Sequence, residues 1–459
     1  MGKPVVTMTG SGTKVSTVIV GLGLTGLSCA RYLASRDEFF AVTDSREEPP
    51  MAEALRRELP GISLFSGGFD VDLLSGAKQL IVSPGVSLDE PEIRQALAAG
   101  VRVIGDVELF CQINQRPVIA VTGTNGKSTV TSLVGAMLVR AGRKVGVAGN
   151  IGVPVLDLVA DPEIEIFVLE LSSFQLETVV SLDAAAAVVL NLSQDHMDRY
   201  TSFQAYVTAK QKIYSGSGVM VINTDDELTR GMRLAGRKSI GFGMGEPEEN
   251  DLGIREWNGA SWLARGHRTL LPVRDLRLFG KHNISNCLAA LALGYAAGIP
   301  EVAMLDSLRE YSGLPHRCQK VAEINGVAWY NDSKGTNSGA SSSAITGLGG
   351  DRNIILIAGG IGKGADFKQL VPAAAGRVRS AILIGRDARL LAEALGEVAD
   401  ICYAVDMDAA VKVAAETARA GDIVLLSPAC SSFDMFSDYR QRGEVFVEAV
   451  RKLQETPAC

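Results

Sequence analysis

The chain has 459 residues, a length that predicts about three domains of roughly 150 residues each. Its net charge of −7 without a long basic run disfavours a nucleic-acid-binding protein, and no apolar run approaches the roughly 20 residues of a membrane-spanning helix. Seven scattered cysteines without a Cys-x-x-Cys pair, and no apparent secretory signal, predict reduced thiols, no zinc site and a cytoplasmic location.

Strand and helix patterns alternate along the chain, which is typical of parallel α/β sheets covered by helices on both faces. The first unit opens with a strand at 18–20 and the turn Gly21-Leu22-Gly23-Leu24-Thr25-Gly26, before a helix. A second strand, 39–42, leads to Asp44-Ser45-Arg46, where a ribose-binding acid is expected. Taken alone, this pattern indicates an NAD-dependent oxidoreductase, but it does not identify the nucleotide.

A second turn in this unit, Ser83-Pro84-Gly85-Val86, ends the predicted strand 80–82. Its hydroxyl and N–H groups could bind the same ligand as the glycine turn. A plain strand-to-helix connection is an equally good interpretation of this segment.

The segment Thr122-Gly123-Thr124-Asn125-Gly126-Lys127-Ser128-Thr129 is the most informative part of the chain. It follows an apolar strand, 117–121, and precedes a helical pattern that Gly142 ends. Backbone N–H groups and a helix N-terminus suit a phosphate, Lys127 adds a positive charge, and the Ser128 hydroxyl can ligate Mg²⁺. The spacing Gly-x-x-Gly-Lys-Ser is shorter than the usual phosphate loop, but its context predicts nucleoside triphosphate binding.

Two further strand ends carry side chains that could hold a metal. The predicted strand 164–169 leads to Glu170, which either shares Mg²⁺ with Ser128 or caps the next helix. The strand 186–190 leads to His196, beside two aspartates, which favours a metal-binding or hydrogen-bonding role. Downstream, 209–214 is predicted as a helix, in which lysines ordinarily form a solvated face.

The middle unit extends to about residue 313, with a polar, weakly patterned stretch near 244–260 that we expect to be a surface excursion. The third unit begins near residue 314. Its predicted strands are 353–358, 380–384 and 423–426, alternating with helices.

These motifs closely resemble those of the Mur ligases, in the same order and over residues 20–443. The matching segments are 21–26, 122–129, Glu-Leu-Ser-Ser-Phe-Gln-Leu-Glu at 170–177, Asp-His-Met-Asp-Arg-Tyr at 195–200, His-Asn-x-x-Asn at 282–286, Gly-Leu-Pro-His-Arg at 313–317, Asn-Asp-Ser-Lys-Gly-Thr-Asn at 331–337 and Leu-Ser-Pro-Ala-Cys-Ser-Ser-Phe-Asp at 426–434. The resemblance implies an α/β protein of three domains. These are a Rossmann-like UDP-substrate-binding domain (1–105), a central P-loop ATPase-like domain (106–313) and a Rossmann-like C-terminal domain that binds the amino acid (314–459).

Within the family, the motifs are most similar to those of members that add D-glutamate to UDP-N-acetylmuramoyl-L-alanine. The resemblance therefore implies an ATP-dependent, ADP-forming amide ligase of peptidoglycan synthesis that acts through an acyl phosphate. Its partners would be three small molecules, with no nucleic acid and no membrane insertion, and we expect a monomer. Two Mg²⁺ ions and a lysine carbamylated by CO₂ are also implied.

The resemblance assigns site residues as follows. ATP would be bound by Gly123, Thr124, Asn125, Gly126, Lys127, Ser128, Thr129, His282, Asn283, Asn286, Arg317, Asp332 and Lys334. The UDP substrate would be bound by Leu24, Thr25, Asp44, Ser45, Arg46, Ser83, Gly85 and Asn150. D-Glutamate would be bound by Thr336, Lys363, Ser432 and Tyr439. Metal ligands would be Ser128, Glu170, His196 and the carbamate of Lys210, and the catalytic residues would be Lys127, His196 and Lys210. Near the amino-acid pocket, Ile361 and Tyr439 differ from the Asp and Phe that relatives often carry.

Four alternatives remain at this point. A nicotinamide oxidoreductase would leave 122–129, Glu170 and His196 without a role. A nucleotide switch or scaffold would not need a third domain with the lysine-bearing glycine turn 359–363. Folylpolyglutamate synthase has a similar short phosphate loop, but near its N-terminus. A Mur ligase that adds another amino acid is the strongest competitor, although the Asp-Asn-Pro-Arg motif of the diaminopimelate-adding type is absent.

Overall fold

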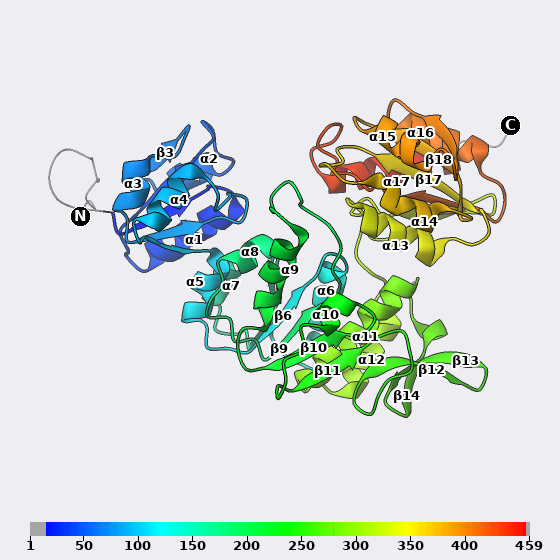
Figure 1. Cartoon of the computed structure of the whole chain (residues 1–459), viewed down its shortest axis with the longest axis horizontal. Coiled ribbons are helices and arrows are strands. Elements are labelled where there is room, and N and C mark those ends of the chain that lie inside the picture. The colour runs from blue at the N-terminus through cyan, green and yellow to red at the C-terminus, as the bar shows by residue number, and fades with distance from the viewer. Residues whose placement is uncertain (1–14, 279, 456–459) are drawn as a thin grey trace.

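The computed structural model describes residues 15–278 and 280–455, and these residues form three lobes, each built on its own sheet (Figure 1). Residues 1–14 and 456–459, which belong to the predicted first and last domains, lie outside the described residues. Within 15–278 and 280–455, none of the helices combines the length and the apolar character of a membrane span.

The first sheet has five parallel strands in the order β3-β2-β1-β4-β5. Its central strand is completely buried, as expected for a parallel sheet with helices on both faces. The strands are β1 Thr17–Val20, β2 Phe40–Asp44, β3 Leu64–Ser66, β4 Gln79–Val82 and β5 Arg102–Ile104, and the helices are α1 Leu24–Ser35, α2 Ala52–Glu58, α3 Val71–Gly76 and α4 Pro91–Ala98. The loops after β1, β2 and β4 therefore meet at one edge, which brings the glycine turn, 44–46 and 83–86 together.

The middle sheet has nine strands in the order β14-β13-β12-β11-β10-β9-β6-β8-β7. Its strands are β6 Val118–Thr122, β7 Val145–Gly149, β8 Ile166–Glu170, β9 Ala186–Val189, β10 Val219–Asn223, β11 Ser239–Phe242, β12 Leu252–Trp257, β13 Ala260–Arg265 and β14 Arg268–Pro272. Its helices are α5 Asp106–Ile113, α6 Lys127–Arg140, α7 Val155–Val159, α8 Ser173–Glu177, α9 Phe203–Gln211, α10 Glu227–Arg230, α11 Lys281–Ala296 and α12 Glu301–Glu310. The parallel pairing of β6 with β8 and β9 places the loops that follow these three strands side by side.

The third sheet has six strands in the order β15-β16-β20-β17-β18-β19. Its strands are β15 Gln319–Ile324, β16 Val327–Asn331, β17 Ile354–Gly359, β18 Val378–Ile384, β19 Asp400–Tyr403 and β20 Ile423–Leu426. Its helices are α13 Ser338–Leu348, α14 Val371–Ala374, α15 Ala388–Leu395, α16 Met407–Thr417 and α17 Tyr439–Glu455. Strands β16, β20 and β17 are parallel, so the loops that follow them also share one edge.

The predicted α/β fold with parallel sheets is confirmed, and antiparallel strands extend the middle and third sheets. Strands β12, β13 and β14 pair antiparallel, as do β15 and β16. The stretch near 244–260, expected as a surface excursion, contains β12 and the start of β13. Asn258 and Gly259 connect these strands with φ angles of 50° and 73°, the left-handed conformations that a tight hairpin turn needs.

Candidate active site

The phosphate loop between β6 and α6 needs glycine at two positions. Gly123 and Gly126 have φ angles of 148° and 83°. A Cβ atom on Gly126 would lie 2.3 Å from Asn286 Oδ1, so this glycine also lets α11 approach the loop. Lys127 folds back over the turn, and its Nζ donates to the carbonyls of Gly123 (2.9 Å) and Thr124 (2.8 Å). Burial lowers the pKa of Lys127, although Glu170 and Asp195 oppose this shift.

Glu170, at the end of β8, is a buried carboxylate that is only half satisfied. Its Oε1 accepts from Asn150 Nδ2 at 2.8 Å, whereas its buried Oε2 has no hydrogen-bond partner among the described residues. An unpaired carboxylate oxygen beside a lysine and a phosphate loop suits a divalent cation. The described residues contain no cluster of three His, Cys, Asp or Glu side chains, but Mg²⁺ needs only one or two carboxylates when substrate phosphates complete its ligands.

His196 and Lys210 both lie near enough to Lys127 for its positive charge to affect them. His196 has a φ of 57°, its Nε2 is 3.6 Å from Asp195 Oδ2, and its ring packs edge-on against Phe174. Burial lowers the pKa of His196, with Asp195 opposing the shift, so a neutral ring that can ligate a metal is favoured.

Lys210 is 2% exposed, which overturns the expectation that lysines in this helix form a solvated face. Its Nζ donates to Gly123 O at 2.9 Å and lies 4.7 Å from the centre of the Tyr206 ring. Burial lowers the pKa of Lys210 well below its ordinary value, and the neighbouring Lys127 adds to this shift. A buried lysine with a depressed pKa has the neutral amine that carbamylation requires.

Two side-chain contacts join the third domain to the middle domain, one of them at the phosphate loop and the other at the loop after β9. Arg317 Nη2 donates to Ser128 Oγ at 2.6 Å, and Asn337 Nδ2 donates to Asp195 Oδ2 at 3.1 Å. Lys334 lies with its Nζ 3.9 Å from the centre of the Tyr439 ring, and burial lowers the pKa of Lys334 to about 8. The cations predicted to reach across from the third domain are therefore beside the loop.

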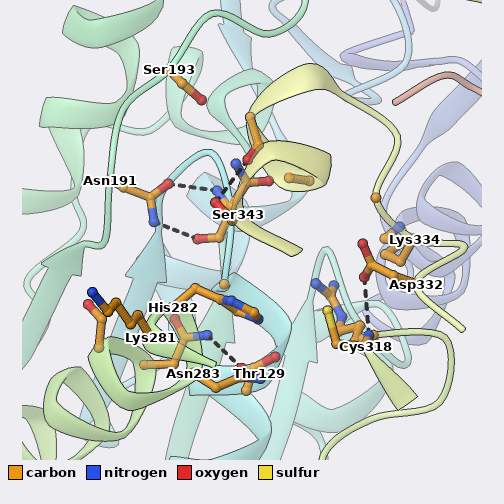
Figure 2. A pocket seen from close by; sticks show the side chains of 18 of the residues that line it. Thr129, Asn191, Ser193, Lys281, His282, Asn283, Cys318, Asp332, Lys334 and Ser343 are labelled. Carbon is orange, nitrogen blue, oxygen red and sulfur yellow. Dashed lines mark hydrogen bonds between the residues drawn. The ribbon is translucent and has the colours of Figure 1, made fainter. Parts of the chain in front are cut away.

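A pocket between the middle and third domains contains the residues predicted for the adenosine end of ATP (Figure 2). His282 and Asn283 lie on one side of it, and Asp332 and Lys334 on the other. Burial raises the pKa of Asp332 to about 6, although its Oδ2 accepts from Ser427 Oγ at 2.7 Å. Sequence reasoning did not assign Asn191, Ser193, Asn223, Asp225, Met244, Lys281, Cys318 or Ser343, which also line the pocket.

A larger cavity of about 770 Å³ runs between all three domains. Its lining includes five residues of the phosphate loop: Thr124, Asn125, Gly126, Lys127 and Ser128. It also includes the predicted metal ligands Glu170, His196 and Lys210. Leu24, Thr25 and Asn150 face it from the predicted UDP set, and Thr336, Lys363, Ser432 and Tyr439 from the predicted amino-acid set. Ile361 and Ser431 exchange backbone hydrogen bonds of 2.9 Å, which places the Lys363 turn beside Ser432.

The other predicted UDP residues lie at the carboxyl edge of the first sheet, outside this cavity. Asp44 accepts from Leu22 N at 2.7 Å and from the Arg46 guanidinium, so it holds the glycine turn and Arg46 in place. Burial would raise the pKa of Asp44, but these donors outweigh it and hold the pKa below its usual value. Ser83 Oγ donates to Gly21 O at 2.9 Å, and Ser45 and Gly85 follow β2 and β4 at the same edge.

Three side chains that sequence reasoning left unassigned connect parts of the site. The Tyr206 hydroxyl is 3.1 Å from Thr124 Oγ1, and Asp195 and Asn337 join the middle and third domains. Tyr206 lies four residues before Lys210 on α9, a spacing that places both on one helix face. That spacing was available in the sequence, whereas the Asp195 contact depends on how the domains pack.

Comparisons with known proteins agree with this architecture. Three family models match in chain order: a MurD-like N-terminal domain of Mur ligases (15–105), a Mur ligase middle domain (121–294) and a Mur ligase glutamate ligase domain (316–430). A UDP-N-acetylmuramoylalanine–D-glutamate ligase from Nitrosococcus oceani is 52% identical over 95% of this chain and 97% of its own length. A protein of the same name from Pseudomonas putida is 51% identical over the same shares of the two chains.

A solved structure of a UDP-N-acetylmuramate–alanine ligase from Thermotoga maritima superposes with a TM-score of 0.60 at 19% identity, covering 96% of this chain and all of that one. At that level of identity the likeness establishes the fold alone. The two relatives, about half of whose aligned residues are identical to those of this chain, cover nearly its whole sequence. This similarity shows that the chain belongs to the Mur ligase family.

Proposed function

We propose that this chain is an ATP-dependent ligase that joins D-glutamate to UDP-N-acetylmuramoyl-L-alanine in peptidoglycan synthesis. The observation that carries the proposal is the cavity of about 770 Å³ between the three domains, which is lined by the phosphate loop, the half-satisfied Glu170 carboxylate and the lysine-bearing turn. Relatives that share about half of their residues with this chain bear the name of that activity. We also propose a cytoplasmic location, which the use of ATP and a UDP-linked precursor supports.

The nucleotide is assigned to the cleft between the middle and third domains. We assign its phosphates to the turn 123–129, where Lys127 and the N-terminus of α6 supply positive charge. Asp332 suits the ribose hydroxyls, and His282 with Asn283 and Asn286 forms the base side of the pocket. Because Arg317 comes from the third domain yet touches Ser128, closure of that domain completes the phosphate site and excludes water.

Divalent cations fit the residues present. Glu170, Ser128, His196 and a carbamate on Lys210 would hold Mg²⁺, which supplies charge stabilisation for the transferred phosphoryl group. The orphan Oε2 of Glu170 and the depressed pKa of the buried Lys210 support this assignment.

The reaction joins a carboxylate to an amine, which requires activation because a carboxylate oxygen is a poor leaving group. An oxygen of the L-alanyl carboxylate attacks the γ-phosphorus of ATP, and ADP leaves. The amine of D-glutamate then attacks the carbonyl carbon of the acyl phosphate and loses a proton, and phosphate departs as the amide forms. Lys127 stabilises charge on the phosphoryl group, and Lys363 holds a carboxylate of D-glutamate so that its amine is oriented.

The choice of amino acid separates this function from the other Mur ligases. We propose D-glutamate because Lys363, Thr336 and Ser432 line the same cavity, where a cation and two hydroxyls suit a dicarboxylate amino acid. Folylpolyglutamate synthesis is disfavoured because residues 15–105 match a Mur ligase N-terminal domain.

The test is to supply the purified protein with UDP-N-acetylmuramoyl-L-alanine, ATP, Mg²⁺ and a panel of D- and L-amino acids, and to measure phosphate release. We expect phosphate release with D-glutamate at a rate at least 100-fold above that with any other amino acid of the panel. Equal or faster release with L-alanine or diaminopimelate would reject the proposed substrate. Release that needs no amino acid would reject a ligase.

A further inference from the structure

Arg199 occupies a position that the proposed mechanism does not use. It lies in the turn 196–200 between β9 and α9, and its backbone N–H donates to His196 O at 2.9 Å. Its guanidinium lies 4.4 Å from the centre of the Phe174 ring on α8, the helix that begins three residues after Glu170. Arg199 therefore belongs to the turn that carries His196 and covers a ring of the helix that begins just after Glu170.

The same guanidinium also reaches the first domain. Its Nη2 donates to Val86 O at 3.3 Å, in the turn that follows β4. Among the described residues, no carboxylate pairs with Arg199, although the side chain is half-buried. The contacts of its guanidinium with protein groups are therefore the Phe174 ring face and the Val86 carbonyl.

The Val86 turn is itself joined to the glycine turn. Val86 N–H donates to Ser83 O at 2.9 Å, and Ser83 Oγ donates to Gly21 O at 2.9 Å. A Cβ atom on Gly21 would lie 2.9 Å from Val86 Cγ2, so the two turns are in close contact. Movement of Val86 would therefore move the edge of the first sheet at which the UDP substrate is assigned.

In the middle domain, aromatic packing connects Arg199 to His196. The Phe174 ring contacts His196 edge-on at 4.9 Å and stacks on Tyr200 at 5.9 Å. Arg199 covers that ring, so the position of its guanidinium is coupled to the position of His196. The chain of contacts runs from Gly21 through Val86, Arg199 and Phe174 to His196.

We propose that Arg199 is a positioning residue that fixes the first domain against the His196 turn, so that the substrate carboxylate meets the phosphate loop. Arg199 does not line the three-domain cavity, so it acts through Val86 and Phe174 and not by touching substrate. The inference rests on the proposed function, because it presumes that the first domain carries one reactant and the middle domain the other. It predicts that loss of Arg199 lowers turnover more than it weakens binding of any substrate.

The experiment compares Arg199→Ala and Arg199→Lys with Ser28→Ala in the purified full chain. Ser28 Oγ donates to Asp157 Oδ1 at 2.7 Å, so this control removes a different hydrogen bond between the same two domains, between α1 and α7. For each variant we would measure kcat, the KM for ATP, the Kd of UDP-N-acetylmuramoyl-L-alanine by calorimetry, and hydrogen exchange of a peptide covering 83–90.

We expect Arg199→Ala to lower kcat at least tenfold while the KM for ATP and the Kd of the UDP substrate change less than threefold. Hydrogen exchange in 83–90 should become faster in Arg199→Ala. Arg199→Lys should recover part of the kcat and part of the protection from exchange, and Ser28→Ala should leave kcat and exchange unchanged. A kcat within twofold of the parent would overturn the proposal. So would an equal loss in Ser28→Ala, which would indicate general loosening, or a raised Kd with unchanged kcat, which would indicate direct substrate contact.

Failure of the proposed function would be recognised separately. If the parent protein released no phosphate with D-glutamate, the exchange measurement would still decide the role of Arg199 in holding the 83–86 turn. Faster exchange confined to Arg199→Ala would support the connection, and unchanged exchange would reject it.

Discussion

Arg442 offers the sharpest test of how the third-domain site is held together. Its side chain is 1% exposed, and its guanidinium donates to Ser333 Oγ (3.0 Å), Ser333 O (2.7 Å) and Cys430 O (3.1 Å). Ser333 belongs to the loop with Asp332 and Lys334, and Cys430 precedes the Ser432 segment. One buried cation therefore joins the loops that follow β16 and β20.

Arg442→Met keeps the apolar part of the side chain but removes every donor. Each buried acceptor left without a donor destabilises the fold by about 1–3 kcal/mol. The desolvation cost of the buried guanidinium disappears in this variant, which offsets part of that destabilisation. We therefore expect a net local destabilisation of about 3 kcal/mol. Since every 1.4 kcal/mol is a factor of ten, backbone amides in 330–337 and 428–433 should exchange hydrogen about 100-fold faster.

The assay is hydrogen exchange followed by mass spectrometry, with Arg451→Met as the matched control because that arginine is exposed on the same helix. The control should leave both peptides unchanged. Exchange in Arg442→Met within threefold of the parent would refute the reasoning that this guanidinium organises the two loops.

Three further predictions concern separate parts of the molecule. Lys210→Ala should lower kcat at least 100-fold at saturating substrates, with ATP affinity by calorimetry changed less than threefold; near-normal kcat would reject the carbamate assignment. Lys363→Ala should raise the KM for D-glutamate at least tenfold and that for ATP less than twofold, and equal effects on both would reject the amino-acid pocket. Burial raises the pKa of Asp106 to about 6, above its ordinary 3.8, so this carboxyl favours the folded state at low pH and loses that contribution as pH rises towards 6. The ionised, buried carboxylate destabilises the folded state by about 1–2 kcal/mol at pH 8. Asp106→Asn removes this cost, so it should raise the Tm by roughly 2–6 °C at pH 8 and by much less near pH 4. A pH-independent difference between the two proteins would contradict this.

The placement of most site residues follows from one rule that can be applied to sequence. Parallel sheets bind ligands at the carboxyl ends of their strands, and Lys127, Glu170 and Asp332 each follow a predicted or observed strand closely. The phosphate loop could be recognised because glycine spacing, strand and helix all occur in one short segment. These local patterns predict which residues share an edge, but not which edges face one another.

The features outside the sequence prediction are two hairpins and the packing of particular side chains. Asn258-Gly259 and Asn325-Gly326 both have positive φ angles and connect antiparallel strands, so the Asn-Gly pairs did carry a hairpin signal. The burial of Lys210 could not be read from helical periodicity, because the phosphate loop covers it from a distant part of the chain. The bridging role of Arg199 likewise depends on the contact between two domains.

The central claim is that the carboxylate of the UDP substrate is activated by phosphoryl transfer in the cavity between the three domains. The most direct measurement uses UDP-N-acetylmuramoyl-L-alanine labelled with ¹⁸O in both oxygens of the alanyl carboxylate, together with ATP, Mg²⁺ and D-glutamate. The account predicts that the released phosphate carries one ¹⁸O atom and the new amide keeps the other. Phosphate without ¹⁸O, released in step with amide formation, would contradict it.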